Sequence, residues 1–571
     1  LLGADICSLV MGCSGRKTAS RIRYQAPGNG FFVSRIVKKE FMGMKASPIY
    51  IYDTTLRDGS QGEQVNFSAE EKLRIARKLD EVGIHYIEGG WPGSNPKDLR
   101  FFEMARQENF QNARLSAFGS TRRPDRTPRD CQNIQALLEA ETPVVTIFGK
   151  TWDLHATEIL GVSLDQNLDI IGESVAYLKE MGKEVIYDAE HFFDGYKSNP
   201  GYALETIKKA FAAGAHMIVL CDTNGGTMTW DVANILKKVK DIIPVERLGI
   251  HAHNDCGLAV ANSLYAARMG VRMIQGTING YGERCGNADL ISIIGNLDLK
   301  MKMESLNETS VRYLTSLSRY VSDVANIPPV NARPFVGRSA FAHKGGVHVS
   351  AVLKNPLAYE HIDPALVGNQ RRVVVSDLAG KSNIEYKARE FGVKLDENNG
   401  LSRKIVQEIK KMEDQGYQFD AADGSLALLI RRATGEFREP FVLESFRVID
   451  EKTKSNASWA QATIKISVGK DHEITAAEGN GPVNALDNAL RKALRKFYPQ
   501  VDAMHLVDFK VRILEGSEGT AAKVRVLLES RDENEIWTTI GVSTNVIEAS
   551  WQALVESIQY KLCKENMNKN H

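Results

Sequence analysis

Cysteine is scarce in this sequence, and its few copies lie far apart. There are seven cysteines in 571 residues, and none of them forms a Cys-x-x-Cys pair. An odd, scattered set argues against a disulfide framework and indicates a reducing compartment. We therefore expect a cytoplasmic protein without structural disulfides.

Long apolar runs and an excess of charge of one sign are also missing. No run approaches the ~18 apolar residues that a membrane-spanning helix needs. The net charge is only +1, which gives no indication of a nucleic-acid or membrane partner. A hydrophobic content of 43% and a charged content of 25% are ordinary for a globular protein. At roughly 100–200 residues per domain, the length predicts about three or four domains.

The first 45 residues differ from the rest of the chain. They hold eight Lys or Arg residues against two acids, Asp5 and Glu40. A basic leader that is poor in acids is typical of a transit peptide. The alternative, which we favour, is a disordered or non-native extension before a functional chain that starts near Met42 or Met44.

From residue 49 onward, short β-prone runs alternate with helical patterns. Ser68 and Glu71 form a predicted capping box before the first helix, and Gly83 is a plausible helix stop. Eight such strand–helix units in about 240 residues favour a (β/α)8 TIM barrel over an open doubly wound sheet. The predicted strands are residues 49–53, 86–90, 114–119, 144–149, 184–191, 217–224, 248–255 and 273–280.

After residue 302 the rhythm changes. Residues 303–412 have mainly helical patterns, and we expect them to form a linker subdomain. Strand-rich segments then precede helices near 482–497 and 547–562, which predicts a C-terminal α+β domain of two weakly similar βββα units. The predicted domains are thus an extension at 1–45, a barrel at 46–302, the linker at 303–412, the α+β domain at 413–564 and a tail at 565–571.

The carboxyl ends of the barrel strands carry the polar residues, which is where barrel active sites form. His251 and His253 lie two apart on a predicted strand, so their side chains share one face. With Asp58, which follows the first strand, they suit a divalent metal, and Asn287 could add an amide oxygen. The alternative is that the two histidines are ordinary polar residues with hydrogen-bond partners.

Arg57 precedes the predicted ligand Asp58. A guanidinium there could hold an anionic oxygen or a carboxylate, or it could form a structural ion pair with Glu88 or Asp222. Phe118 and Phe148 end two strands, and their rings could narrow a substrate pocket, although phenylalanine is also a common core residue.

Several motifs together resemble the family of 2-isopropylmalate, homocitrate and citramalate synthases. These are DTTLRDGSQ, HAHND, NGYGERCGNADL and FAHKGGVHVSAVLKNPLAYE, in that order along roughly residues 48–563. Two further stretches, GWPGSNPKD and DAEHFFDGY, look like the branch that is assigned as (R)-citramalate synthases. The resemblance implies that acetyl-CoA condenses with pyruvate and water to give (R)-citramalate and CoA.

The resemblance also implies roles for individual residues. His348 would be central to deprotonating acetyl-CoA, while His343 ranks below it because the Gly-x-His context matches at 348. The flanks of Glu190 depart from the family, which puts the role of Asp188 in doubt. The implied catalytic residues are Arg57, Glu190, His348 and Tyr359; the substrate-binding residues are Arg57, Gln61 and Thr223; and the metal ligands are Asp58, His251, His253 and Asn287.

The implied partners are small molecules and a second copy of the chain. The resemblance predicts a divalent metal ion (Mn, Mg, Co or Zn), acetyl-CoA as co-substrate, a homodimer, and feedback by isoleucine or leucine at the C-terminal domain as part of isoleucine biosynthesis. The nearest rival activities are 2-isopropylmalate synthase and then homocitrate synthase. More distant rivals are a metal-dependent C–C lyase or aldolase and a non-catalytic binding protein on the same barrel.

Overall fold

A computed structural model describes residues 48–395, 400–452, 458–514 and 516–568. The extension expected at residues 1–45 and the last three residues of the expected tail lie outside the described residues.

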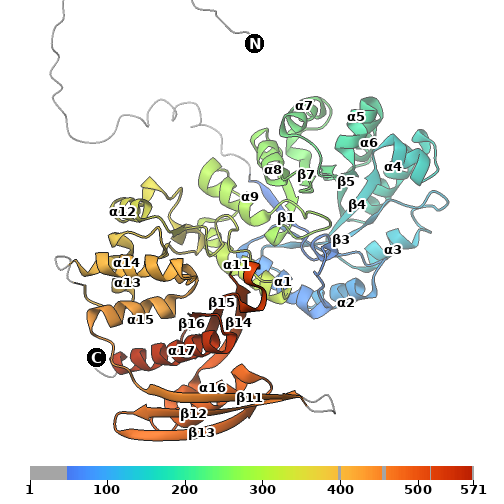
Figure 1. Ribbon diagram of the computed structural model, residues 1–571. Coiled ribbons are helices and arrows are strands. Elements are labelled where there is room, and N and C mark those ends of the chain that lie inside the picture. The colour runs from blue at the N-terminus through green and yellow to red at the C-terminus, as the bar shows by residue number, and fades with distance from the viewer. Residues whose placement is uncertain (1–47, 396–399, 453–457, 515, 569–571) are drawn as a thin grey trace, which may run out of the picture. The chain divides into compact units, whose positions relative to one another are not determined.

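Eight parallel strands form a closed barrel in sequence order (Figure 1), which confirms the predicted TIM barrel and excludes the open sheet. The strands β1 and β8 pair in parallel and close it. The strands are β1 Tyr50–Asp53, β2 Tyr86–Gly90, β3 Arg114–Ser120, β4 Val144–Lys150, β5 Glu184–Glu190, β6 Met217–Asp222, β7 Leu248–Ala252 and β8 Met273–Gly276. The helices around them are α1 Ala69–Val82, α2 Pro96–Ala105, α3 Gln132–Glu139, α4 Leu164–Glu180, α5 Phe192–Ser198, α6 Pro200–Ala212, α7 Thr229–Val239, α8 Ala259–Arg268 and α9 Leu290–Asn296.

Helix α1 shows how local sequence sets the boundaries of an element. The Ser68 side chain accepts from the Glu71 N–H, and the Glu71 carboxylate accepts from the Ser68 N–H, so the predicted capping box is present. Gly83 ends the helix with φ 91°, a left-handed conformation that favours glycine. Leu73, Ala76 and Leu79 of this helix are buried in the main core.

The linker that follows the barrel is mainly helical, as predicted. Helix α14 (Leu401–Asp414) shares a hydrophobic core with Ile384, Phe419 and the next helix, α15 (Asp423–Thr434). Helix α15 lies beyond the predicted end of the linker at residue 412. Helix α14 continues to Asp414, two residues beyond the boundary placed at 412. The elements are α10 Glu308–Val311, α11 Leu314–Val324, β9 Ala342–His343, α12 Gly346–Lys354, β10 Arg372–Val373, α13 Lys381–Glu390, α14 Leu401–Asp414 and α15 Asp423–Thr434.

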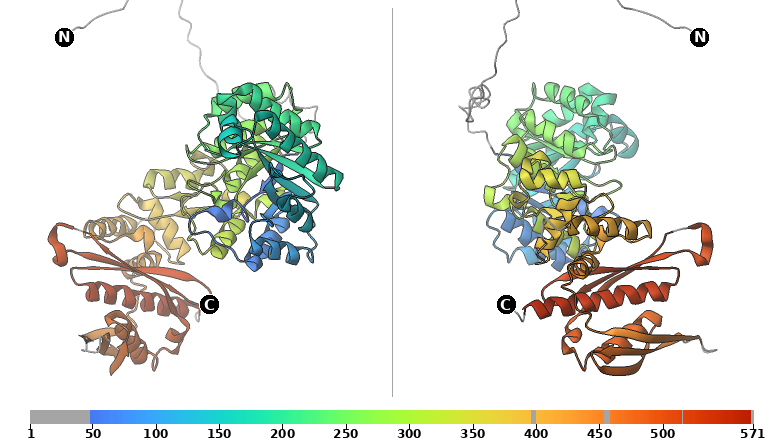
Figure 2. Two further views of the ribbon diagram at one scale, coloured as in Figure 1. Left: turned by 90° about the vertical axis from the view of Figure 1, so that its right-hand side faces the viewer. Right: turned by 60° about the vertical axis from the view of Figure 1, so that its left-hand side comes forward.

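The C-terminal domain consists of two βββα units, as predicted. Each unit is an antiparallel three-stranded sheet followed by one helix, and the two helices pack between the sheets (Figure 2). The third strand of the first unit, β13, is an addition, because the sequence patterns identified only two strands there. The elements are β11 Val442–Lys452, β12 Ser458–Val468, β13 Asp471–Gly479, α16 Pro482–Leu494, β14 His505–Ile513, β15 Val524–Arg531, β16 Ile536–Ser543 and α17 Val546–Asn568.

The described residues bear on the membrane helix and the disulfides considered above. None of the described helices is both long enough and apolar enough to cross a membrane. The five cysteines in the described residues are all free.

Candidate active site

Asp58, His251 and His253 converge at the carboxyl rim of the barrel and form the candidate metal centre. The Nε2 atoms of the two histidines are 3.4 Å apart, and they lie 3.3 Å (His251) and 3.8 Å (His253) from Oδ2 of Asp58. A triangle with these three sides has a circumscribed circle of about 2.0 Å radius, so one point lies at metal–nitrogen distance from all three atoms. All three residues are buried.

The chain beyond β7 keeps the second histidine beside the first. Strand β7 ends at Ala252, and His253 follows in an isolated β-bridge with Asn287. The extended backbone continues through this bridge, so both imidazoles point to the same side. The ion pair between Arg284 and Asp255, with contacts of 2.7 and 2.9 Å, fastens the loop that carries Asn287.

Several buried polar atoms at this centre lack a partner. Oδ1 of Asp58, Nδ1 of His253 and Oδ1 of Asn287 are buried and make no hydrogen bond within the described residues. The amide nitrogen of Asn287 donates to the carbonyl of Tyr281 at 3.3 Å, which leaves its oxygen as the free end. An unsatisfied buried acceptor is costly, and the Asn287 oxygen is one that a cation could satisfy, whereas Asp58 and His253 face the centre with Oδ2 and Nε2 and not with their unpaired atoms. One carboxylate, two imidazoles and an amide oxygen suit a divalent cation. The residues present therefore fit a metal ion.

A hydrogen-bonded chain holds His251 in one tautomer. Nδ1 of His251 contacts Oε1 of Gln275 at 2.8 Å, and Nε2 of Gln275 donates to Oδ1 of Asp188 at 3.0 Å. An amide oxygen only accepts, so Nδ1 of His251 carries the proton and Nε2 presents its lone pair to the centre. All three residues are buried.

The pKa shifts at the centre do not all run the same way. Burial would lower the pKa of His251, but the hydrogen bond and the charge of Asp58 outweigh it and raise the pKa. Burial would raise the pKa of Asp58, but Arg57 and His251 outweigh it and hold the pKa well below its usual range. Burial, helped by the neighbouring His251, lowers the pKa of His253 to about 4. Burial, with the nearby Glu88, raises the pKa of Asp188 to about 7. A charged carboxylate and a neutral imidazole are the forms that bind metal ions.

Arg57 lies beside the centre and is anchored on its far side. Its Nε donates to Glu88 at 2.6 Å, and its Nη1 is 3.2 Å from Asp58. The predicted alternative of an ion pair with Glu88 is therefore present, whereas Asp222 instead accepts from Thr227. Nη2 of Arg57 makes no hydrogen bond within the described residues, so this donor can serve a substrate.

An aromatic wall, formed by Trp91, Phe118 and Phe148, borders Arg57. The two phenylalanine rings stack with centroids 5.4 Å apart, and the Trp91 ring meets both edge-on at 5.8 and 5.6 Å. The guanidinium carbon of Arg57 lies 3.7 Å from the centroid of the Phe118 ring. The wall therefore places aromatic rings directly against the positive charge.

The other predicted barrel residues lie on the same rim. Glu190 ends β5 and pairs with Lys150, which the sequence reading did not select. The Thr223 hydroxyl accepts from the His191 backbone N–H at 2.9 Å, a local contact within the rim. Gln61 is exposed at the end of a short 3₁₀ helix, and its side chain makes no hydrogen bond within the described residues.

His348 and Tyr359 lie together in the linker rather than in the barrel. Their rings are 4.3 Å apart, and Tyr359 is 47% exposed. His343, the competing histidine, is buried and contacts Glu360 at 3.0 Å. Of the two histidines, His348 is exposed and His343 is not.

The sequence motifs did not single out Gln275 and left the role of Asp188 in doubt, although a signal existed for both. Gln275 lies inside an otherwise apolar strand, and Asp188 lies inside another. A polar side chain in the middle of a buried strand needs a partner, but the sequence does not show which strand supplies it.

A closed (β/α)8 barrel with a carboxylate and two histidines converging at its carboxyl rim defines the class, a barrel protein with a candidate catalytic metal centre. Three family models match successive parts of the chain. The HMGL-like model matches residues 48–321, the homocitrate synthase post-HMGL domain-like model matches 335–417, and the LeuA allosteric (dimerisation) domain matches 420–562.

Curated relatives match nearly the whole chain. An (R)-citramalate synthase of Geobacter sulfurreducens is 55% identical over 91% of this chain and 98% of the relative. That of Aquifex aeolicus is 54% identical over 91% and 99%. A probable 2-isopropylmalate synthase of Methanopyrus kandleri is 31% identical over 89% and 97%. The chain belongs to the (R)-citramalate synthase family.

Proposed function

We propose that this enzyme condenses acetyl-CoA with pyruvate and water to give (R)-citramalate and CoA. The observation that carries the proposal is the cluster of Asp58, His251 and His253 beside Arg57, in a chain 52–55% identical to three (R)-citramalate synthases. A carboxylate–imidazole centre and an adjacent guanidinium are what a 2-oxo acid needs for binding by its keto and carboxylate oxygens.

Pyruvate is the proposed acceptor because aromatic rings border the space beside Arg57. The stacked rings of Phe118 and Phe148, capped by Trp91, form one side of it. A methyl group fits such a space better than the branched or acidic chains of 2-oxoisovalerate and 2-oxoglutarate, because inserting extra methylenes against packed rings costs free energy.

The proposed metal ligands are Asp58, His251, His253 and Asn287, and the ion would be Mn, Mg, Co or Zn. A bound divalent cation would act as a Lewis acid on the keto group. The Asp188–Gln275 pair holds the first histidine in the ligating tautomer.

The remaining residues are proposed to move protons and orient the substrates. His348, assisted by Glu190 and Tyr359, removes a proton from the acetyl methyl group, whose carbon then bonds to the keto carbon of pyruvate. Arg57 stabilises the oxyanion through its free Nη2, the new alkoxide takes up a proton, and water hydrolyses the thioester to release CoA. Gln61 and Thr223 are proposed to hydrogen-bond the 2-oxo acid.

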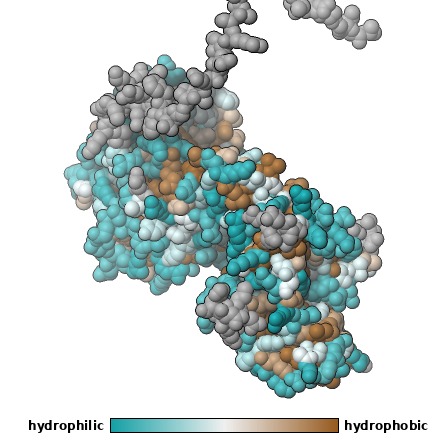
Figure 3. Space-filling view, turned by 90° about the vertical axis from the view of Figure 1, so that its left-hand side faces the viewer, coloured by the Kyte–Doolittle hydropathy of each residue, from teal (hydrophilic) through white to brown (hydrophobic). Residues whose placement is uncertain are grey.

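We propose a homodimer in which His348 and Tyr359 reach the partner's barrel. Near them, Val347 and Leu357 are 78% and 80% exposed, and Figure 3 shows apolar patches on the side of the molecule where α12 lies in Figure 1. Apolar side chains such as Val511 and Ile474 are also exposed on the two C-terminal sheets. Exposed apolar patches of this kind are typical of protein–protein interfaces.

The C-terminal domain is proposed to bind isoleucine, with leucine as the alternative effector, and the enzyme to work in the cytoplasm as an early step of isoleucine biosynthesis. The match to an allosteric domain model supports this regulation. Isothermal titration with isoleucine and with leucine tests it, and absence of heat from both amino acids would remove the regulatory proposal.

Thiol release from acetyl-CoA tests the reaction. Pyruvate, 2-oxobutyrate, 2-oxoisovalerate and 2-oxoglutarate are compared side by side at equal concentration. We expect the highest kcat/KM with pyruvate. A preference for 2-oxoisovalerate or 2-oxoglutarate would reassign the enzyme within the synthases, and thiol release from none of them would leave a lyase or a binding protein.

A further inference from the structure

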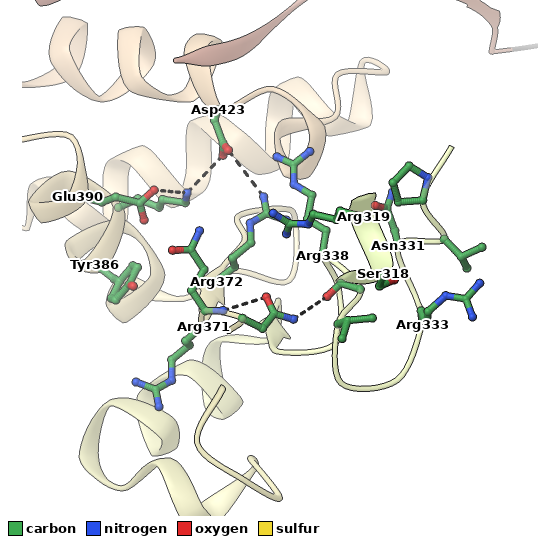
Figure 4. A pocket seen from close by; sticks show the side chains of 17 residues that line it. Ser318, Arg319, Asn331, Arg333, Arg338, Arg371, Arg372, Tyr386, Glu390 and Asp423 are labelled. Atoms are coloured by element: carbon green, nitrogen blue, oxygen red, sulfur yellow. Dashed lines mark hydrogen bonds and ion pairs between the residues drawn. The ribbon is translucent and has the colours of Figure 1, made fainter. Parts of the chain in front are cut away.

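A cavity of about 700 Å³ lies between α11, the following loop and α13 (Figure 4). None of the proposed catalytic or metal-binding residues lines it. Its volume falls in the range of small-molecule sites.

Positive side chains dominate this cavity. Six cations and two carboxylates line it: Arg319, Arg333, Arg338, Arg371, Arg372 and Lys387 against Glu390 and Asp423. Four of the cations have carboxylate partners, two of which, Asp289 and Glu360, are not among the lining residues. The other two, Arg319 and Arg338, have no carboxylate within ion-pair distance in the described part of the chain.

Arg372 is only weakly compensated. Its one carboxylate partner is Asp423 at 3.8 Å, and Asp423 is shared with Lys387 at 3.3 Å. Burial lowers the pKa of Arg372, and the like charge of Arg338 lowers it further. Figure 4 shows the guanidinium groups of Arg319, Arg338 and Arg372 pointing toward one another. We call these three residues the arginine pocket.

The three guanidinium groups come from three separate segments and keep their charge, because arginine does not lose its proton in proteins. An anion bound among them would relieve their mutual repulsion. One carboxylate would neutralise only one of them. A phosphate group presents several oxygens to the fork of a guanidinium, and two linked phosphates supply the charge that three arginines need. Tyr386, which also lines the cavity, offers a further hydroxyl donor.

We propose that the arginine pocket binds a compact polyanion with phosphate groups. Two sources share this chemistry: a free phosphate compound, and the diphosphate and 3′-phosphate of a coenzyme A molecule. The proposal does not depend on the condensation reaction, since binding is measured without turnover.

Isothermal titration of the full-length protein tests the proposal, with pyrophosphate, CoA, 3′-dephospho-CoA and citrate as probes. The variants are Arg338→Gln and Arg319→Gln, both at exposed side chains, so folding is retained. Arg403→Gln is the matched control, because Arg403 is exposed on α14 outside the cavity. We expect pyrophosphate to bind the wild type and the control equally, and each pocket variant about tenfold more weakly.

The probes separate the two sources. If coenzyme A occupies the pocket, both variants weaken CoA binding, and 3′-dephospho-CoA binds the wild type more weakly than CoA. If a free phosphate compound occupies it, the variants weaken pyrophosphate binding and leave CoA binding unchanged. Equal pyrophosphate binding by wild type and variants, no binding of pyrophosphate or CoA, or tighter binding of citrate than of pyrophosphate would overturn the proposal.

Discussion

Gln275 is predicted to set the metal affinity without touching the metal. Gln275→Leu removes the acceptor for Nδ1 of His251 and the donor for Asp188, two buried contacts of 2.8 and 3.0 Å. His251 then loses the bond that fixes its tautomer, and the Asp188 carboxylate is left buried without this donor. A buried group deprived of its partner costs about 1–3 kcal/mol, and loss of a residue that supports a metal ligand weakens metal binding about 10–100-fold.

The assay is competition for Mn²⁺ or Zn²⁺ between the metal-free protein and a chromogenic chelator at fixed pH and salt. Gln107→Leu is the matched control, since Gln107 is exposed in the turn that follows α2. The double change Gln275→Glu with Asp188→Asn exchanges the carboxylate and the amide and keeps an acceptor for His251, so we expect it to recover most of the affinity. An unchanged dissociation constant in Gln275→Leu would refute the reasoning.

Three further predictions concern catalysis, acid stability and packing. Glu190→Gln and His348→Ala should each lower kcat at least about 100-fold, the range of general acid–base effects, while chelator competition shows unchanged metal affinity. Burial lowers the pKa of His85, whose Nδ1 accepts the N–H of Ile51 at 3.1 Å. The unfolded chain therefore takes up a proton on this histidine at a higher pH than the folded protein does. The free energy of unfolding should fall as pH drops below about 6.5. In urea unfolding, His85→Gln should lose less of this free energy between pH 7.5 and 5 than the wild type. Gly541→Ala would place a Cβ atom 1.9 Å from a backbone oxygen of α17 and should lower the free energy of unfolding by roughly 1–3 kcal/mol.

Each of these predictions has a result that contradicts it. Loss of metal from the Glu190 or His348 variants would place these residues at the metal centre instead. A His85→Gln protein with the same acid dependence as the wild type would show that this histidine does not contribute. For Gly541, the control is Gly469→Ala. Its Cβ would meet no atom within 4 Å, although its φ of 61° adds strain. Equal losses of unfolding free energy in the two variants would show that the contact with α17 is not the cause.

The barrel and the convergence of Asp58, His251 and His253 could be predicted from the sequence because both depend largely on local patterns. Strand–helix alternation is visible in a window of a few residues, and the His-x-His spacing fixes which face two side chains share. Ser68 and Glu71 likewise specify a helix start without any distant partner. The chain His251–Gln275–Asp188 could not be predicted, because it joins β7, β8 and β5 across the barrel interior, and its members meet only after closure.

The positions of His348 and Tyr359 also follow only partly from the sequence. Their motif placed them in the linker, and the structure brings the two rings together at 4.3 Å. Whether they serve a barrel depends on association of two chains, which is a property of exposed surfaces and not of any local pattern. The arginine pocket is a similar case, since its three arginines come from segments up to about 50 residues apart in the chain.

The central claim is that Asp58, His251 and His253 hold one divalent cation at the mouth of the barrel. Anomalous diffraction from crystals of the protein soaked with Mn²⁺ tests it most directly. We predict a single strong peak about 2.0–2.3 Å from Oδ2 of Asp58 and from Nε2 of both histidines, with Oδ1 of Asn287 facing it. A peak that lies elsewhere, or contact with only one of the three side chains, would contradict the account.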